Sequence, residues 1–324
     1  MREAFYRRAP GRPGSRMRRA ARLAQHVPDM LRYARAAPAA DVIHFQWLPV
    51  QQIDGALLPR GRPRVLTAHD VLPREPRRGQ LAAQCRLYER MDAVVVHSEH
   101  GAARLRDEAR VDPARIHVIA HGAFAHATCA PAGAALPPEL TSPSGPVVLC
   151  FGLMRPYKGI DVLLDAWRAL ERPSGSELWI VGMPRMDLTN LRDGAPPGVR
   201  WVPRYVPQGE LAAVFRRADL AVLPYREIDQ SGVLFTALAF GLPMVLSAVG
   251  GFGELAATGA VELVPPDDHA ALAGVLLSLL GDPERRARMA RAASLAASPD
   301  GPYGWDTIAR RHLGLYHALL DRPR

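Results

Sequence analysis

Near the middle of the chain, residues 151–161 read FGLMRPYKGID, between an apolar run and a segment with helical periodicity. The apolar run 147–151 is typical of a buried strand, and residues 160–170 repeat their apolar side chains as a helix does. Gly152 permits a tight turn, and Gly159 allows the backbone to approach a ligand where the helix begins. This strand–turn–helix unit is the building block of an α/β domain with a parallel sheet.

Two cations, Arg155 and Lys158, lie in this turn. The chain has 41 Lys and Arg residues against 32 Asp and Glu, and Lys158 is its only lysine. Two cations in front of a helix N-terminus suit a diphosphate, whereas the plainer interpretation is a turn with two solvated cations. Neither a GxxxxGK[ST] loop nor a GxGxxG fingerprint is present. We favour the diphosphate site because an arginine-rich chain uses its single lysine here.

Strands and helices alternate on both sides of this turn, as they do in parallel βαβ units. Toward the C-terminus the pattern predicts strands at 178–181, 199–202, 220–223 and 244–247, and helices at 210–217, 232–240 and 269–280. Toward the N-terminus it predicts strands at 41–45, 64–68, 92–97 and 116–120, and helices at 79–90 and 99–109. Residues 2–35, rich in Arg and Ala, are expected to form a loop followed by a solvated helix.

The length allows more than one domain. With 324 residues, 48% of them hydrophobic, the chain can form two globular domains, and the Pro- and Gly-rich residues 130–146 suit a linker. We expect a Rossmann-like domain at 1–142, a second at 143–303, and a closing helix at 304–324 that packs back toward the first. The ligand crevices of two such domains would lie opposite one another across a cleft.

A second junction from strand to helix reads LPYREIDQSGV at residues 223–233. Ser231 suits the N-cap of the helix that follows. The amides of Gly232 and Val233 belong to its first turn and can hold the same phosphates from the other side. The alternative is a plain capped helix.

Two more segments follow predicted strands. The sequence GGFGE at 250–254 predicts a flexible turn that lets the backbone approach a substrate, or else a simple connection. Ser98 is expected to cap the helix that begins at Glu99, and His97 beside it is given a structural role.

In the N-terminal half, polar side chains follow two predicted strands. His44, Gln46 and Trp47 lie at the end of one strand, and His69 and Asp70 follow the next. His69 can bond a sugar or a leaving phosphate, and Asp70 can orient an acceptor hydroxyl. The plainer alternatives are a satisfied strand-end histidine and a helix cap.

Composition restricts the partners and the compartment. A pI near 10.1 favours anionic ligands, but specific nucleic-acid binding is not expected, because only 6% of the residues are aromatic. Cys85, Cys129 and Cys150 lack CxxC spacing, so neither a disulfide framework nor structural zinc is expected and a reducing cytosol fits. No apolar run reaches the ~18 residues of a transmembrane helix, and no signal-peptide core opens the chain.

A cluster of arginines lies near the N-terminus and suits either a solvated face or peripheral contact with an anionic membrane, such as the inner face of the cell membrane. Its members are Arg7, Arg8, Arg12, Arg16, Arg18, Arg19 and Arg22.

Three segments in this order, FGLMRPYKGIDVLLDAW, SGVLFTALAFGLPMVLS and GGFGE, resemble the carboxy-terminal domain of the retaining glycosyltransferases of family 4, also called glycosyl transferases group 1. The resemblance covers residues 147–280 and implies the GT-B fold, with two Rossmann-like domains that face a cleft. It implies that Arg155 and Lys158 bind the donor diphosphate. The other donor contacts that it implies are at Gly152, Glu227, Ser231, Gly232, Val233, Thr236 and Glu254.

The chain departs from this family in two places. Thr236 stands where the family usually has a glutamate that bonds the ribose, and a hydroxyl bonds more weakly than a carboxylate. The position of the second family glutamate falls near Ile228, between Glu227 and Asp229. At the N-terminus, arginine-rich sequence stands where a strand and a Gly-rich loop are usual. We expect the first βα unit to be replaced, or to be missing because the start lies inside a longer reading frame.

The stretch Thr67-Ala68-His69-Asp70 is similar to a T-x-H-D or T-x-H-N motif of GT-B enzymes, whose histidine contacts the transferred sugar. The resemblance implies catalytic roles for His69 and Asp70. Gln46 stands where some relatives have a catalytic histidine, so His44, Gln46 and Trp47 are expected to line the acceptor side.

These observations predict a retaining, hexosyltransferase-like enzyme that takes a sugar from a UDP-, GDP- or ADP-sugar without a metal. A DxD metal clamp is absent from the sequence. The acceptor is expected to be a carbohydrate, a lipid-linked glycan or a small molecule, as in polysaccharide biosynthesis. The alternative is a non-catalytic protein of degenerate transferase fold that binds sugar nucleotides as a scaffold.

Overall fold

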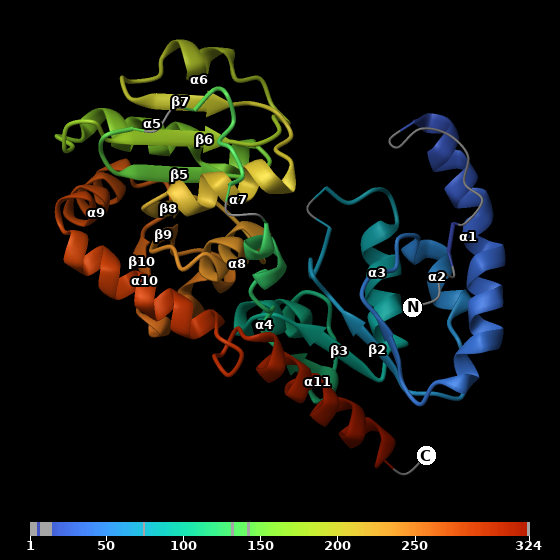
Figure 1. Cartoon of the computed structure of the whole chain (residues 1–324). Helices are drawn as coiled ribbons and strands as arrows, with labels where there is room; N and C mark the ends of the chain where they lie inside the picture. The colour runs from blue at the N-terminus through green and yellow to red at the C-terminus, as the bar shows by residue number, and fades with distance from the viewer. Residues whose placement is uncertain (1–4, 7–14, 74, 131–132, 141–142, 323–324) are drawn as a thin grey trace. The chain divides into compact units, whose positions relative to one another are not determined.

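A computed structural model describes residues 5–6, 15–73, 75–130, 133–140 and 143–322 of the chain (Figure 1). The chain divides into two compact units: unit 1 is Met1–Ile119 with Arg311–Arg324, and unit 2 is Ala120–Arg310. The division into domains at 1–142, 143–303 and 304–324 stays a prediction. Arg7, Arg8 and Arg12 of the N-terminal cluster lie outside the described residues.

Unit 2 contains a six-stranded parallel sheet with the order β10-β9-β8-β5-β6-β7. Its strands are β5 (Val147–Phe151), β6 (Glu177–Val181), β7 (Val199–Val202), β8 (Leu220–Leu223), β9 (Met244–Ser247) and β10 (Val261–Val264). The chain adds β6 and β7 on one side of β5 and then crosses to the other side to begin β8. The strand order therefore reverses between β5 and β8, which is where open α/β sheets bind ligands.

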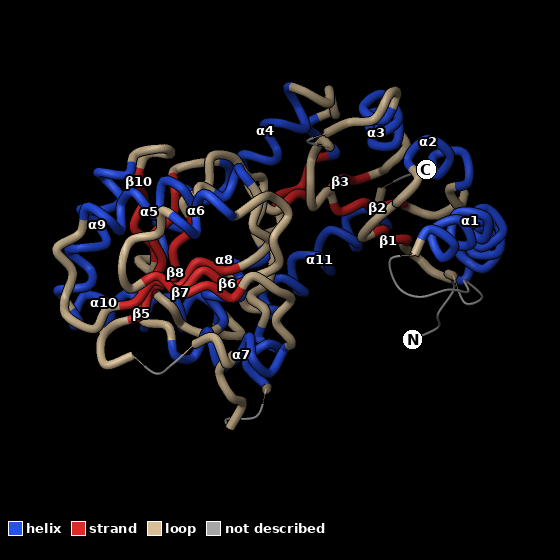
Figure 2. The backbone as a smooth tube through the Cα atoms, turned by 90° about the horizontal axis from the view of Figure 1, so that it is seen from above, coloured by secondary structure: helices blue, strands red, loops and turns tan. Residues whose placement is uncertain are grey.

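The helices of unit 2 cover both faces of this sheet (Figure 2). Alternate residues of a strand point to opposite faces, so Val148 packs with one helical layer and Val147 with the other. The helices are α5 (Ile160–Ala169), α6 (Thr189–Asp193), α7 (Gln208–Arg217), α8 (Gly232–Ala239), α9 (His269–Gly281) and α10 (Pro283–Ala297). Burial on both faces explains why the central strands β5, β8 and β9 are nearly continuous apolar runs.

Unit 1 contains a four-stranded parallel sheet with the order β1-β2-β3-β4. The strands are β1 (Ile43–Phe45), β2 (Arg64–Thr67), β3 (Ala93–Val96) and β4 (Ile116–Val118). The helices are α1 (Arg16–Ala36), α2 (Gln51–Leu57), α3 (Gln80–Glu89) and α4 (Glu99–Asp107), and the last residues of α11 (Trp305–Leu320) also belong to this unit. The carboxyl ends of β1, β2 and β3 are neighbours at one edge.

Short 3-10 helices complete the described chain: η1 (Ala37–Ala39), η2 (Pro113–Arg115), η3 (Ala125–Cys129), η4 (Pro156–Lys158) and η5 (Gly250–Thr258). The expected flexible turn at 250–254 is thus wrong, because these residues form the start of η5. No helix of the described residues is long and apolar enough to cross a membrane. Within the same residues, His, Cys, Asp and Glu side chains form no group of three or more suited to a metal ion.

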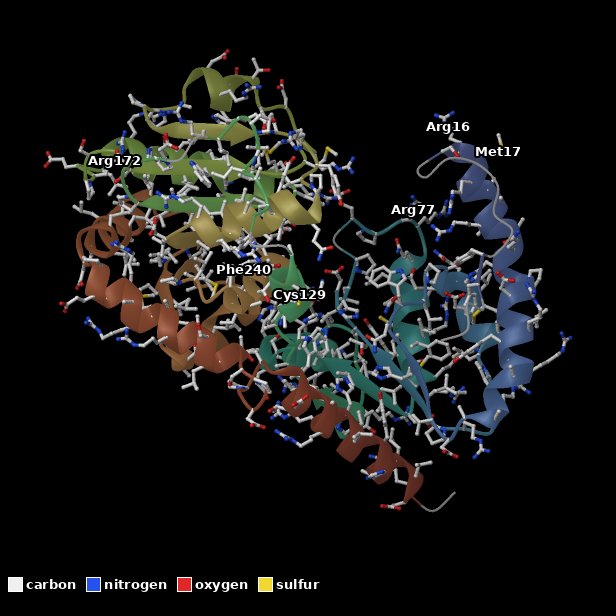
Figure 3. The ribbon with its side chains drawn as sticks, viewed as in Figure 1. Arg16, Met17, Arg77, Cys129, Arg172 and Phe240 are labelled. Atoms are coloured by element: carbon white, nitrogen blue, oxygen red, sulfur yellow. The ribbon has the colours of Figure 1, made fainter. Side chains whose placement is uncertain are left out.

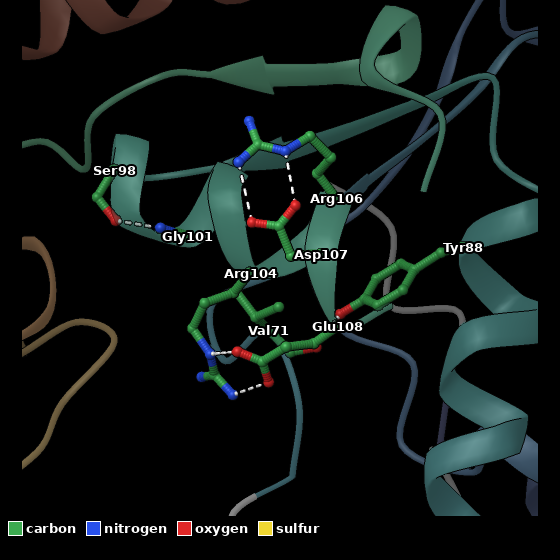
Figure 4. Close-up of polar contacts among 8 residues, drawn as sticks. All are labelled: Val71, Tyr88, Ser98, Gly101, Arg104, Arg106, Asp107 and Glu108. Carbon is green, nitrogen blue, oxygen red and sulfur yellow. Dashed lines mark hydrogen bonds and ion pairs between the residues drawn. The ribbon is translucent and has the colours of Figure 1, made fainter. Parts of the chain in front are cut away.

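The start of α4 confirms the cap expected at Ser98. Its hydroxyl accepts a hydrogen bond from the amide of Gly101 at 3.0 Å (Figure 4). Two arginine–carboxylate pairs follow on the same helix, between Arg104 and Glu108 and between Arg106 and Asp107. These surface pairs contribute little, and the cap contributes more.

One expectation and one alternative for unit 1 need correction. Helix α1 is solvated on one side only, because His26, Asp29 and Met30 are buried on the other. Asp70 does not cap a helix, because the next helix, α3, begins ten residues later behind Gly79. Among the described residues, no strand precedes β1, and α1 occupies that part of the chain.

Candidate functional site

In unit 2, the loops that follow β5 and β8 meet at the point where the strand order reverses. Gly159, between η4 and α5, has a φ of +64°, and a Cβ atom there would overlap the carbonyl oxygen of Pro224. Only glycine fits both the left-handed conformation and the close approach. Gly152 has a φ of +121°, and its missing Cβ would lie 3.1 Å from the Val233 side chain. These contacts bring the two predicted phosphate loops together.

Lys158 is buried, with 7% of its surface exposed. Its ammonium nitrogen lies 3.6 Å from the centre of the Tyr225 ring and 5.3 Å from that of Tyr157. Both rings attract the cation through their π faces. Cys150 beside it is a neutral thiol, because burial raises its pKa to about 12. The rings of Tyr157 and Tyr225 thus fix the ammonium group of Lys158 in the loop that follows β5.

Arg226 connects the two loops. Its amide donates to the carbonyl of Tyr157 at 2.8 Å, and its guanidinium donates to the carbonyl of Pro156 and to both carboxylate oxygens of Asp161. These hydrogen bonds lower the pKa of Asp161. The positive charge of Arg226 is therefore paired with the carboxylate of Asp161, whereas Arg155, on the loop that follows β5, is exposed.

Ser231 stands at the N-cap position of α8, but the expected side-chain cap is wrong. The hydroxyl of Ser231 makes no capping hydrogen bond and lies 3.3 Å from the hydroxyl of Tyr225 instead. The amides of Gly232 and Val233 belong to the first turn of the helix, where no carbonyl of the helix itself can accept from them. The N-terminus of α8 and the Tyr225 ring that holds Lys158 are thus neighbours.

The remaining predicted donor residues lie farther along these elements. The hydroxyl of the buried Thr236 donates to the carbonyl of Gly232 at 2.9 Å, so only its lone pairs remain for another partner. Glu227 is exposed in the loop after β8. Glu254 lies on η5 and lines a separate pocket of about 500 Å³ together with Tyr303. Burial, and then the charge of Glu254, raise the pKa of Tyr303 to about 12.

In unit 1, a chain of hydrogen bonds crosses the carboxyl ends of the first three strands. Nε2 of His44 lies 2.8 Å from the hydroxyl of Thr67 and 3.3 Å from the amide nitrogen of Gln46. The amide oxygen of Gln46 lies 3.2 Å from Nε2 of His69. Nδ1 of His69 lies 3.0 Å from Nε2 of His97. Five polar residues, His44, Gln46, Thr67, His69 and His97, thus form one network.

The carbonyl of Ile119 determines which nitrogen atoms donate and which accept in this network. It lies 2.9 Å from Nδ1 of His97 and can only accept, so His97 carries its proton on Nδ1. Nε2 of a neutral His97 then accepts, and His69 donates from Nδ1. At the other end, burial lowers the pKa of His44 to about 4 and keeps that ring neutral.

A pocket of about 190 Å³ adjoins this network. His69, the exposed Asp70 and Trp47 line it, together with the amide side chains of Gln51 and Gln80, which hydrogen bond to each other at 3.1 Å. The pocket presents hydrogen-bonding groups of the kinds that recognise hydroxyls. The five predicted residues of this half therefore lie at one edge of the sheet.

Two residues of the network were missed as functional. His97 directly follows the apolar run Val94-Val95-Val96. His69 also lies just after a strand, so the position of His97 at a strand end could have indicated a functional role. Tyr316 of α11 lies 2.7 Å from Nδ1 of His44. It is 272 residues away in the chain, so no spacing could have indicated it.

Two family models match the chain. Residues 2–123 match Glycosyltransferase Family 4, and residues 145–282 match Glycosyl transferases group 1. Together they cover both parallel sheets.

Curated relatives include a D-inositol 3-phosphate glycosyltransferase of Kineococcus radiotolerans, 31% identical over 75% of this chain. The chain spans only 61% of the length of that relative. A GDP-mannose:glycolipid 4-beta-D-mannosyltransferase of Xanthomonas campestris is 27% identical over 87% of this chain and 81% of its own.

Solved structures show the same fold at lower identity. Sucrose-phosphate synthase from Thermosynechococcus elongatus superimposes with a TM-score of 0.70 at 22% identity, over 92% of this chain and 79% of its own. Anabaena HepE, in complex with UDP-glucose, superimposes with a TM-score of 0.71 at 21% identity, over 91% of this chain and 84% of its own. Both parallel sheets of this chain therefore have counterparts in known structures.

Proposed function

We infer, because the chain belongs to the glycosyltransferases of the GT-B type, that it moves a sugar from a nucleotide-diphosphate donor to an acceptor. Unit 2 binds the donor, and unit 1 binds the acceptor. The transferred sugar keeps its anomeric configuration, by attack on the same face from which the diphosphate leaves. UDP-, GDP- and ADP-sugars are the candidate donors, and a carbohydrate or a lipid-linked glycan is the candidate acceptor.

One observation carries this proposal: the buried Lys158 and the N-terminus of α8 lie together at the reversal of strand order in unit 2. When the bond to the sugar breaks, negative charge develops on the diphosphate. An ammonium group fixed by two aromatic rings stabilises that charge without reorganising, and so do first-turn amides. Arg155, exposed on the same loop, supplies a second cation. These groups perform the task that a metal ion performs in other transferases.

In unit 1, His69 and Asp70 take the roles expected from the sequence. His69 bonds the sugar or its leaving phosphate, and the exposed carboxylate of Asp70 orients the acceptor hydroxyl in the pocket that both residues line. The name of the Xanthomonas relative includes a glycolipid acceptor, and the HepE structure contains UDP-glucose. Both agree with a nucleotide-sugar donor and a glycan-containing acceptor.

Calorimetry of the full chain with UDP, GDP and ADP tests the donor site. One nucleotide should bind, and Lys158→Met, which keeps the length of the side chain and removes the charge, should weaken binding by about tenfold or more. Arg168→Met, which removes an exposed cation of α5 paired with Asp165, is the matched control and should bind normally. Unchanged affinity in Lys158→Met would refute the site.

Transfer and binding together separate the enzyme from the scaffold alternative. Incubation of the matching sugar nucleotide with a panel of acceptors should release the nucleoside diphosphate and yield product with retained configuration. Donor binding without transfer or hydrolysis would favour a non-catalytic protein.

We also propose that α1 contacts an anionic membrane surface. Met17, Leu23, Val27 and Leu31 are exposed along one side of α1, with exposed fractions of 37% to 67%. Figure 3 shows Arg16 and Met17 at the N-terminal end of this helix, where both side chains are exposed. An apolar stripe flanked by arginine is typical of helices that lie in an anionic lipid interface.

Sedimentation with vesicles tests this contact. The chain should bind phosphatidylglycerol vesicles and not phosphatidylcholine vesicles, and Leu23→Glu with Val27→Glu should abolish binding. Leu277→Glu, at an exposed leucine of α9, is the control. Equal binding to both vesicle types would contradict the proposal.

A further inference from the structure

A second pocket of unit 1, of about 480 Å³, lies between α1 and the end of β1. Aromatic side chains dominate its wall: Phe5, Tyr6, Tyr33, Phe45 and Trp47. The rings of the first four are in contact, with the centres of Phe5 and Tyr33 5.6 Å apart and those of Tyr33 and Phe45 6.0 Å apart. Such a wall offers a large apolar surface.

Tyr6 and His26, two polar residues of this wall, already have partners. The hydroxyl of Tyr6 lies 2.7 Å from Nδ1 of His26, and Nε2 of His26 donates to Oδ1 of Asp54 at 2.5 Å. The other carboxylate oxygen of Asp54 accepts from the amide of Val50 at 2.8 Å. His26 and Asp54 are both buried. A polar occupant beside Tyr6 and His26 would lose its hydrogen bonds to water without finding new ones there, so this part of the wall favours an apolar occupant.

Trp47 connects this aromatic pocket to the pocket of His69 and Asp70, because it lines both. More than half of its surface is exposed, 59%, so the indole is accessible to a ligand. Gln46 and His44 of the hydrogen-bond network also line the aromatic pocket. A hydroxylated ligand beside His69 would therefore have an apolar surface next to it.

We propose that the acceptor is amphiphilic, with a sugar beside His69 and Asp70 and an alkyl or aryl aglycone in the aromatic pocket. This inference rests on the proposed function, because it assumes that unit 1 binds the acceptor. The aromatic pocket supplies affinity for the aglycone, and the smaller pocket orients the reacting hydroxyl. Each methylene of an alkyl chain that leaves water for the pocket raises affinity by up to about fourfold.

Direct binding of matched glycosides tests the proposal. The probes are the methyl, hexyl and phenyl glycosides of glucose and of mannose, titrated into the full chain and followed by saturation-transfer NMR and calorimetry. Hexyl or phenyl glycoside should bind about tenfold or more tightly than the methyl glycoside of the same sugar. The hexyl and phenyl arms distinguish an alkyl from an aryl aglycone. Equal affinities, or no binding of any probe, would overturn the proposal.

Variants at two residues, Phe5 and Trp47, locate the aglycone. Phe5→Ala alters only the aromatic pocket and should reduce the affinity ratio of hexyl to methyl glycoside. Trp47→Ala should reduce the ratio as well, and Trp47→Phe should restore part of it. Tyr205→Ala removes an aromatic side chain of unit 2 that is 69% exposed, and it should leave the ratio unchanged. An unchanged ratio in Phe5→Ala and Trp47→Ala, both folded by thermal melting, would place the aglycone elsewhere and refute the pocket.

The transfer assay with the same glycosides separates this inference from the proposed function. Preference for the hexyl or phenyl glycoside in binding without any transfer would leave the pocket standing and refute the transferase. Transfer at equal kcat/KM to methyl, hexyl and phenyl glycosides would support the transferase and refute the aromatic pocket as the aglycone site.

Discussion

Nε2 of His97 accepts the Nδ1 hydrogen of His69 across 3.0 Å, with the two ring centres 4.9 Å apart. Because Nδ1 of His97 donates to the carbonyl of Ile119, His97 can only accept at its other nitrogen while it is neutral. It therefore fixes a proton of His69 on Nδ1. Nε2 of His69 faces the amide oxygen of Gln46, which can only accept a hydrogen bond. In this network His97 is a positioning residue.

Replacing His97 by alanine should lower kcat/KM for transfer by about tenfold, the value of one hydrogen bond, and leave donor affinity unchanged. His97→Gln should restore part of the activity, because its amide oxygen can accept the same hydrogen. The ring ¹⁵N chemical shifts of His69 report the tautomer, and they should change in His97→Ala. His117→Ala, on β4 of the same sheet, is the control. Loss of activity without any change in the tautomer would assign His97 a structural role only.

Strands β8 and β9 were predictable because they are buried on both faces. Leu220–Leu223 and Met244–Ser247 begin and end at the predicted residues, and so does Val199–Val202, although Arg200 is exposed. Helix α10 was missed because its sequence, PERRARMARAASLAA, is rich in Arg and Ala and buries only a few small side chains and Met289. Strand β10 was missed because Glu262 interrupts a run of four residues. Helix α2 is short and contains Gly55, so it gave no helical signal.

The candidate site was predictable only where chemistry follows a strand directly. Lys158 lies in the loop that follows β5, and His69 lies two residues after β2. Within each parallel sheet, the topology brings the loops at the carboxyl ends of neighbouring strands together. Tyr225 could not be identified as the ring that holds Lys158, because its contact depends on the crossing from β7 to β8. The aromatic pocket depends on how α1 packs on the end of β1, which periodicity does not determine.

Gly159→Ala should destabilise unit 2 by about 1–3 kcal/mol or more, since alanine disfavours the left-handed conformation there. The added Cβ would also meet the carbonyl of Pro224. Gly274→Ala is the matched control, because open space surrounds Gly274 in the middle of α9. There alanine should stabilise the chain by up to about 1 kcal/mol. Urea unfolding measures both, and a neutral Gly159→Ala would show that the two loops separate readily.

The stability of unit 1 should decrease in mild acid because of His44. Burial lowers the pKa of His44 to about 4, whereas an unfolded histidine has a pKa of about 6.5. The unfolded chain binds this proton more readily, so the free energy of unfolding falls as the pH falls from about 6.5 toward about 4. His44→Asn lacks the group and should lose less stability over the same interval.

Urea unfolding of the wild type and of His44→Asn at pH 7 and pH 5 measures this difference. Burial also lowers the pKa values of His117 and His121. Both proteins contain these two residues, so their contribution cancels in the comparison. Equal losses of stability in the two proteins would mean that His44 does not titrate as its burial implies.

Arg226 should control donor affinity although it is not expected to touch the donor. It holds the loop of Lys158 to the loop that precedes α8 through Pro156, Tyr157 and Asp161. Arg226→Lys keeps the charge and loses the paired hydrogen bonds that only a guanidinium makes. We expect about tenfold weaker nucleotide binding in calorimetry and an intact fold, because a shift of about 1 Å between the loops separates Lys158 from the amides of α8.

The titration of Asp161 checks that this loss has the expected cause. Hydrogen bonds from Arg226 lower the pKa of Asp161, so its carboxyl ¹³C signal should titrate at higher pH in Arg226→Lys than in the wild type. Arg310→Met, which removes an exposed arginine paired with Asp300, should change neither quantity. Weaker nucleotide binding without a change in the titration of Asp161 would mean that Arg226 acts on the donor directly. An unchanged affinity with a raised pKa would mean that the two loops keep their places without it.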